Sequence, residues 1–169
     1  MLSSALLAAI LVVAVAFDLK ERRIPNLLII VGLLTALFFQ GLHASWGGLL
    51  FSLQGFLDGL ALLFLPFLWG GIGAGDVKLL AVVGAFQGPT QVFYTFLYMA
   101  LWGGLIACLL LLWHRNLLST LRRWGNGFRL GGVSFSAAAR AGEKQIFFPY
   151  ALAIALGALT QAVLVWWGI

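Results

Sequence analysis

Residues 73–78 have the sequence Gly-Ala-Gly-Asp-Val-Lys, and this stretch decides how the rest of the chain is interpreted. An apolar run ends in the glycines, and the next apolar run starts at Asp76. The chain has only five acidic residues in 169, and a carboxylate beside a membrane-length apolar segment costs free energy. We therefore expect Asp76 to have a function. Its closest counterpart is Asp18, which ends the first apolar run.

The composition indicates an integral membrane protein. Hydrophobic residues make up 63% of the chain and charged residues 9%, whereas a soluble domain is about half apolar and about a quarter charged. We expect one membrane-embedded domain over residues 1–169. The net charge of +5 does not indicate nucleic-acid binding, because the basic residues fall in short loops between apolar runs. The single cysteine, Cys108, excludes an internal disulfide and a cysteine-based zinc site.

The apolar runs predict an all-α fold with six transmembrane helices. A spanning helix needs about 20 mainly apolar residues. The runs do not alternate polar with apolar residues, as the strands of a membrane barrel would. The six expected spans cover approximately residues 2–18, 26–42, 48–69, 76–87, 91–113 and 146–167.

The basic residues predict the orientation of these spans. With six spans, three loops lie on one side of the membrane, and they hold all ten Lys and Arg residues. By the positive-inside rule that side is cytoplasmic, and both termini face outward. The basic residues are Lys20, Arg22 and Arg23 in the first loop, Lys78 in the second, and Arg115, Arg122, Arg123, Arg129, Arg140 and Lys144 in the third, 114–145. The third loop also has apolar residues at helical spacing, so we expect an interfacial helix whose simpler partner is membrane lipid and whose alternative partner is the substrate.

This topology places Asp18 and Asp76 at the same depth, near the cytoplasmic surface. Two carboxylates that meet there cannot both ionise easily, so one stays protonated while the other acts as a base. Aspartic proteases use this arrangement to activate water against a peptide carbonyl. Gly73 and Gly75 are expected to permit the turn and the close backbone approach that deliver Asp76 to a helix start. Pro25 is expected to start a helix in the same way.

Two segments resemble the type IV prepilin peptidase family of membrane aspartic proteases, which carry a Gly-x-Gly-Asp motif. Residues 18–26, Asp-Leu-Lys-Glu-Arg-Arg-Ile-Pro-Asn, resemble the first catalytic segment of the family. Residues 73–80, Gly-Ala-Gly-Asp-Val-Lys-Leu-Leu, resemble the second, and residues 149–157 resemble the closing helix of the short, Tad-type members. The resemblance implies that Asp18 and Asp76 are catalytic. By position in the motifs, Gly73, Gly75, Lys20, Lys78, Pro25 and Asn26 would support the site.

The resemblance also implies a substrate and a location. Family members remove the short basic leader from prepilin or pseudopilin precursors at the cytoplasmic face of the bacterial inner membrane. For this chain we expect no cofactor and no metal site. Longer members carry an additional Cys-x-x-Cys segment, and many methylate the new N-terminus. That segment is missing between residues 18 and 26, so the resemblance does not decide whether this chain methylates its product. It names neither the substrate-binding residues, nor the individual substrate, nor the oligomeric state.

Asp58 supports an alternative. It lies near the middle of the third apolar run, where insertion of a carboxylate costs about 2.5–3.5 kcal/mol. Asp58 could have a structural role only, as a hydrogen-bond partner of a neighbouring helix. Gln54, one turn earlier on the same helix, is another possible partner. Alternatively, Asp58, Asp18 and Asp76 could form the relay of a small ion or proton transporter. A third alternative is a non-catalytic partner in pilus assembly.

Overall fold

A computed structural model describes residues 2–113 and 150–168 of the protein. Five helices make up the described part of the chain, which confirms the all-α prediction. They are α1 (Leu2–Glu21), α2 (Asn26–Leu68), α3 (Ala74–Gln87), α4 (Pro89–Trp113) and α7 (Tyr150–Trp167). The loop 114–145, with its expected interfacial helix, lies outside the described residues.

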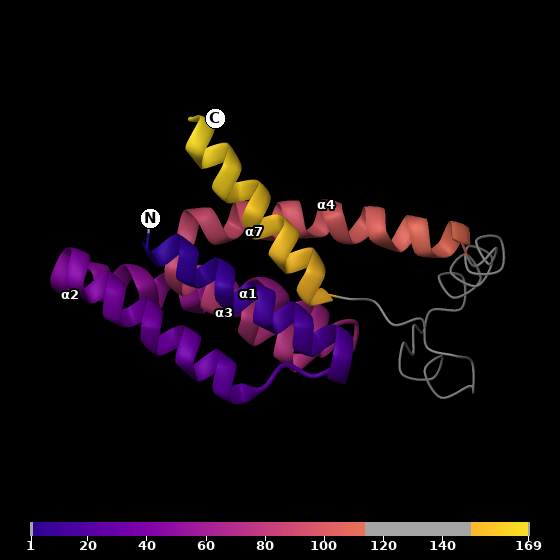
Figure 1. Ribbon diagram of the computed structural model, residues 1–169, viewed down its shortest axis with the longest axis horizontal. Coiled ribbons are helices and arrows are strands. Elements are labelled where there is room, and N and C mark those ends of the chain that lie inside the picture. The colour runs from indigo at the N-terminus through magenta and orange to yellow at the C-terminus, as the bar shows by residue number, and fades with distance from the viewer. Residues whose placement is uncertain (1, 114–149, 169) are drawn as a thin grey trace.

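Helix α2 contains the second and third expected spans, joined at a sharp turn. Ala44 and Ser45 have non-helical backbone angles, and Ser45 has a positive φ of 48°. A Cβ added to Gly48 would collide with the carbonyl oxygen of Gln40, so the backbone after the turn approaches the backbone before it. Figure 1 shows α2 doubling back at this turn. We call residues 26–43 its first arm and residues 46–68 its second arm.

Helix α3 lies against both arms of α2. On the second arm, a Cβ at Gly59 would lie 2.7 Å from Ala81 Cα, and Gly55 and Gly84 face each other so closely that a Cβ on either would collide with the carbonyl oxygen of the other. On the first arm, the Gln40 side-chain amide donates a 2.8 Å hydrogen bond to the Phe86 carbonyl. The short α3 is therefore enclosed, and its residues from Leu79 to Phe86 are all buried.

Helices α4 and α7 complete the bundle. They contact each other closely, and α7 also contacts α1 and α3. The Trp102 indole N–H of α4 donates a 3.0 Å hydrogen bond to the Thr160 hydroxyl of α7. Figure 1 shows the N- and C-termini toward one end of the bundle, whereas α1 and α4 end, and α7 begins, toward the other. The side of the membrane that each end faces stays a prediction.

Within residues 2–113 and 150–168, four helices are long and apolar enough to cross a membrane: α1, α2, α4 and α7. This supports a membrane protein. Two of the six expected spans are the arms of α2, and α3, at 14 residues, is shorter than the roughly 20 residues that a crossing needs. Six crossings therefore stay a prediction. Much of the outer surface is apolar, as a membrane-facing surface would be, and Trp69, Trp166 and Trp167 are among its most exposed side chains.

Candidate active site

The two aspartates singled out in the sequence come together in the structure. Asp18 lies in the last turn of α1, and Asp76 lies in the first turn of α3. Both side chains are almost completely buried, with 7% of Asp18 and 9% of Asp76 exposed. They are close enough for the charge on Asp18 to act on the Asp76 carboxyl group. Residues 58 positions apart in the sequence thus form one buried acidic pair.

Each carboxyl group is held at a helix N-terminus by one backbone contact. The Asp76 carboxyl group hydrogen-bonds with the backbone of Gly73, the N-cap residue of α3. The Asp18 carboxyl group hydrogen-bonds with the backbone of Ala151, in the first turn of α7. The first N–H groups of a helix have no partner within the helix, and its dipole favours negative charge there. The pair is therefore fixed by α3 on one side and by α7 on the other.

One oxygen of each carboxyl group makes no described hydrogen bond. Asp18 Oδ2 and Asp76 Oδ1 are buried, and neither has a hydrogen-bond partner in the described part of the chain. A buried carboxyl oxygen without a partner carries a desolvation cost. That cost can be offset when the oxygen holds a proton or binds a reacting group. Because the aspartates interact, a proton on one stabilises the ionised form of the other.

The glycines of the second motif act through close contact. Gly73 has φ −75° and ψ 148°, and a Cβ there would lie 3.1 Å from Asp76 Oδ2. A Cβ at Gly75 would lie 3.3 Å from the Ile24 Cβ, so this glycine lets the second motif pack against the first. Neither glycine has a positive φ, contrary to the expected role in the turn; the left-handed residue after α2 is Gly70, with φ 74°. A glycine after the last helical turn commonly takes this conformation.

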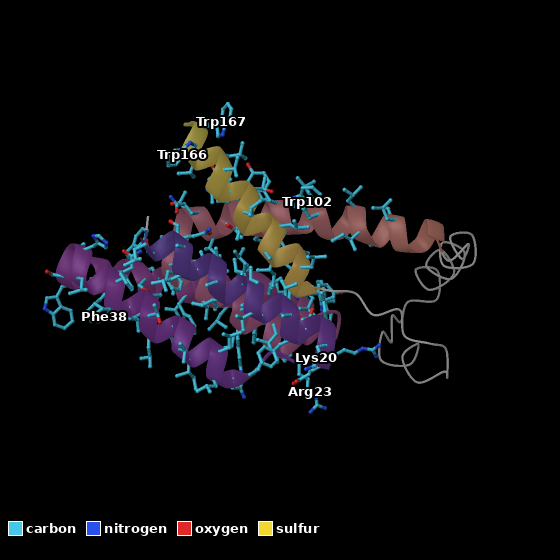
Figure 2. The ribbon with its side chains drawn as sticks, in the orientation of Figure 1. Lys20, Arg23, Phe38, Trp102, Trp166 and Trp167 are labelled. Atoms are coloured by element: carbon cyan, nitrogen blue, oxygen red, sulfur yellow. The ribbon has the colours of Figure 1, made fainter. Side chains whose placement is uncertain are left out.

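The remaining motif residues lie around the pair rather than on it. Pro25 is the N-cap residue of α2, so the prediction that it starts a helix is confirmed. The Lys78 ammonium group donates a 3.0 Å hydrogen bond to Asn26 Oδ1, which links the start of α3 to the start of α2. Lys20 is exposed and extends away from the helices, at the same end of the bundle as Arg23 (Figure 2). No described contact joins Lys20 or Lys78 to either aspartate.

Two helices extend a few residues beyond the approximate spans expected from the sequence, and both extensions lie next to an aspartate. The first helix continues to Glu21, so Asp18 lies inside its last turn instead of ending it. Helix α3 begins at Ala74, so Asp76 is its third residue instead of its first. Both carboxyl groups are consequently held on helical backbone. Helical backbone fixes a side chain more firmly than a loop does.

Sequence reasoning missed Tyr150. Its hydroxyl donates a 2.7 Å hydrogen bond to the Gly71 carbonyl in the segment between α2 and α3, and the ring is near enough to Asp76 to interact with its charge. The available signal was position: Tyr150 follows Pro149 at the predicted cytoplasmic start of the last apolar run. Asp18 and Asp76 are predicted at the same depth in the membrane, so the first residues of this run are expected to lie near them.

Asp58 does not join the pair. It is exposed on the second arm of α2, where it lines a hollow of about 220 Å³ with Ala61, Leu62, Pro89 and Phe93. Neither Asp18 nor Asp76 lines this hollow. Gln54 is also exposed, and no described contact joins it to Asp58. The expected bond to a neighbouring helix is therefore not formed within the described residues.

One comparison with known proteins gave a match. A family model described as the type IV leader peptidase family matches residues 5–108, which include Asp18, Asp76 and both sequence motifs. No curated protein and no solved structure matches the chain.

Proposed function

This chain belongs to the type IV leader peptidase family, and on that basis we propose that it is an aspartic endopeptidase of the bacterial inner membrane. Its substrate would be a prepilin-like precursor, from which it removes the short basic leader at the cytoplasmic face. The observation that carries the proposal is the buried pair of Asp18 and Asp76, whose charges interact. Family membership supplies the type of reaction, and the pair supplies groups able to perform it.

The proposed chemistry uses one proton shared between the two aspartates. The ionised aspartate takes a proton from water while the water oxygen attacks the peptide carbonyl carbon. The protonated aspartate donates a hydrogen bond to the carbonyl oxygen. The tetrahedral intermediate collapses when the carbon–nitrogen bond breaks and the nitrogen receives a proton from the pair. Asp18 Oδ2 and Asp76 Oδ1 are the oxygens with no other described partner, so these two atoms would move the protons.

The depth of the pair agrees with such a substrate. Asp18 lies three residues before the end of an apolar helix, and basic side chains follow it immediately. A peptide bond placed there would lie at the edge of the membrane, between a basic leader and a hydrophobic segment. This is where a precursor with those two parts would present its cleavage site.

Coexpression with a small precursor tests the proposal. The precursor should have a basic leader, a glycine at the junction and a hydrophobic helix, and intact-mass measurement should follow it. We expect mass loss equal to the leader with the wild-type chain, and none with Asp76→Asn at equal amounts in the membrane. Cleavage that persists unchanged with Asp76→Asn would contradict an aspartic mechanism and would favour a contaminating protease.

The transporter alternative receives no support from the geometry. A relay would need Asp58 to face the acidic pair, yet Asp58 lines a separate hollow on the exposed side of α2. The alternative of a non-catalytic assembly partner makes a different prediction in the same assay. It requires that Asp76→Ala restore pilus assembly in a deletion strain.

A further inference from the structure

The N-terminus of α7 contacts Asp18 and the segment that precedes Asp76. Its first residue, Tyr150, donates a hydrogen bond to the Gly71 carbonyl, five residues before Asp76. Its second residue, Ala151, hydrogen-bonds through its backbone with the Asp18 carboxyl group. Adjacent residues of one helix therefore hold the segment before Asp76 and hold Asp18 directly.

The start of α7, which makes these two contacts, is itself packed tightly in the bundle. Ala151, Ala153 and Ile154 are completely buried, so the first turn of α7 is fixed by packing as well as by hydrogen bonds. The segment it holds is short: Gly71 is the second residue before Gly73, the N-cap of α3 that contacts the Asp76 carboxyl group. A shift of Tyr150 would therefore be passed through Gly71 and Gly73 to Asp76.

The geometry points to Tyr150 as a positioning residue that, together with the Ala151 backbone, sets the separation of Asp18 and Asp76. This inference rests on the proposed function. It assigns to α7, which the family match over residues 5–108 does not include, the task of keeping the two carboxyl groups close enough for their charges to interact. Tyr150 acts through Gly71 and does not itself exchange protons with the substrate.

The physical reason is the steep dependence of the pair on distance. The interaction between two charges falls as they separate, and water between them weakens it further. If the carboxyl groups move apart, each titrates more independently, and the pH range in which the pair holds a single proton becomes narrower. Tyr150 should therefore affect the shape of the pH profile, which a purely stabilising residue would not.

Tyr150→Phe tests this directly, because it removes only the hydroxyl. We expect kcat to fall by about 10- to 100-fold, the range expected for displacement of a reacting group, with little change in KM. We also expect the bell-shaped pH profile of kcat to narrow. The matched control is Trp102→Phe, which removes the 3.0 Å hydrogen bond between α4 and Thr160, ten residues farther along α7. The control should lower thermal stability but keep the shape of the profile.

A second variant covers the other contact. Ala151→Pro removes the backbone N–H beside Asp18 at a first-turn position, where proline is tolerated in helices. It should narrow the profile in the same way, and it carries the test if Tyr150→Phe protein does not fold. A wild-type profile in either folded variant would overturn the inference.

Titration without substrate separates this inference from the proposed function. Infrared difference spectra of the purified protein should show two protonation steps from the acidic pair, and Asp18→Asn and Asp76→Asn should each leave only one of them. The exposed cations Lys20, Arg22 and Lys78 also lie at this end of the bundle. They are the same in every variant, so they do not account for a difference between the titrations. If the pH values of the two steps lie closer together in Tyr150→Phe than in the wild-type protein, the result supports the inference, even if the wild-type protein cleaves no precursor. If the pH difference between the two steps is unchanged, the inference is refuted.

Discussion

Gly75 lies directly against Ile24, so the two sequence motifs are in contact. A Cβ at residue 75 would lie 3.3 Å from the Ile24 Cβ and 3.6 Å from its Cγ1 and Cδ1 atoms. Ile24 belongs to the segment that follows Asp18, and Gly75 immediately precedes Asp76. This contact helps to bring two segments that are far apart in the chain to a common depth.

Substitution of Gly75 should therefore separate the aspartates. Gly75→Ala requires Ile24 to move by a few tenths of an ångström and should lower activity moderately, whereas the branched side chain of Gly75→Val should lower it much further. Over-packing of this kind costs about 1–3 kcal/mol of stability. The measurement is precursor cleavage together with thermal unfolding in detergent.

Gly104→Ala is the control for this series. A Cβ at Gly104 in α4 would meet no atom within 4 Å, so this variant should keep full activity and stability. Equal activity of Gly75→Val and the wild-type chain would show that the contact with Ile24 does not position Asp76.

The packing of α3 against α2 depends on the glycine pair Gly55 and Gly84. A Cβ on either residue would collide with the backbone carbonyl of the other, and backbone atoms cannot move aside as a flexible side chain can. We expect Gly55→Ala to lower the unfolding free energy by about 1–3 kcal/mol, measured by denaturation in detergent. A melting temperature equal to that of the wild-type chain would contradict this packing.

Asp58 should be dispensable for peptide cleavage. It lies apart from the acidic pair, on the exposed side of α2, and residues without shared contacts contribute independently. Asp58→Asn should therefore cleave the precursor at close to the wild-type rate. A loss as large as that of Asp76→Asn would connect Asp58 to the site and revive the relay. Proteoliposome flux measurements would then be the next test.

The rate should depend on pH in a bell-shaped manner. Below the range in which the pair holds one proton, both aspartates are protonated and no base remains. Above it, both are ionised and no acid remains. On each outer side the rate should change by about tenfold per pH unit, because one proton controls it. A rate that stays constant from acidic to strongly alkaline pH would exclude a shared proton.

The distribution of charged residues makes the two aspartates of the site predictable from the sequence. It does not predict the contacts that hold them in place. All ten basic residues fall in three of the expected loops, and that pattern alone predicts a common level for Asp18 and Asp76. The glycines of residues 73–75 indicate close approach, although they do not identify Ile24 as the neighbour. The sequence indicates the depth of these residues because inserting a charged side chain into a membrane costs free energy.

The attachments through α7 could not be predicted in this way. The contacts of Tyr150 with Gly71 and of Ala151 with Asp18 join residues 79 and 133 positions apart, and both depend on how α7 packs against α1 and α3. Periodicity says nothing about the partner of a helix. The turn at Ala44 and Ser45 lies in the gap between the expected spans 26–42 and 48–69, and its positive φ at Ser45 could not be predicted because serine does not favour that conformation as glycine does.

Asp18 and Asp76 should act as one catalytic unit, and single-turnover cleavage by the two single variants and the double variant distinguishes this from two independent contributions. Groups that act together show strongly non-additive losses. We predict that Asp18→Asn, Asp76→Asn and the double variant lose the same amount of activity, each remaining folded with wild-type thermal stability. A single variant that retains the wild-type rate, or a double variant whose loss is the product of the two single losses, would contradict the claim.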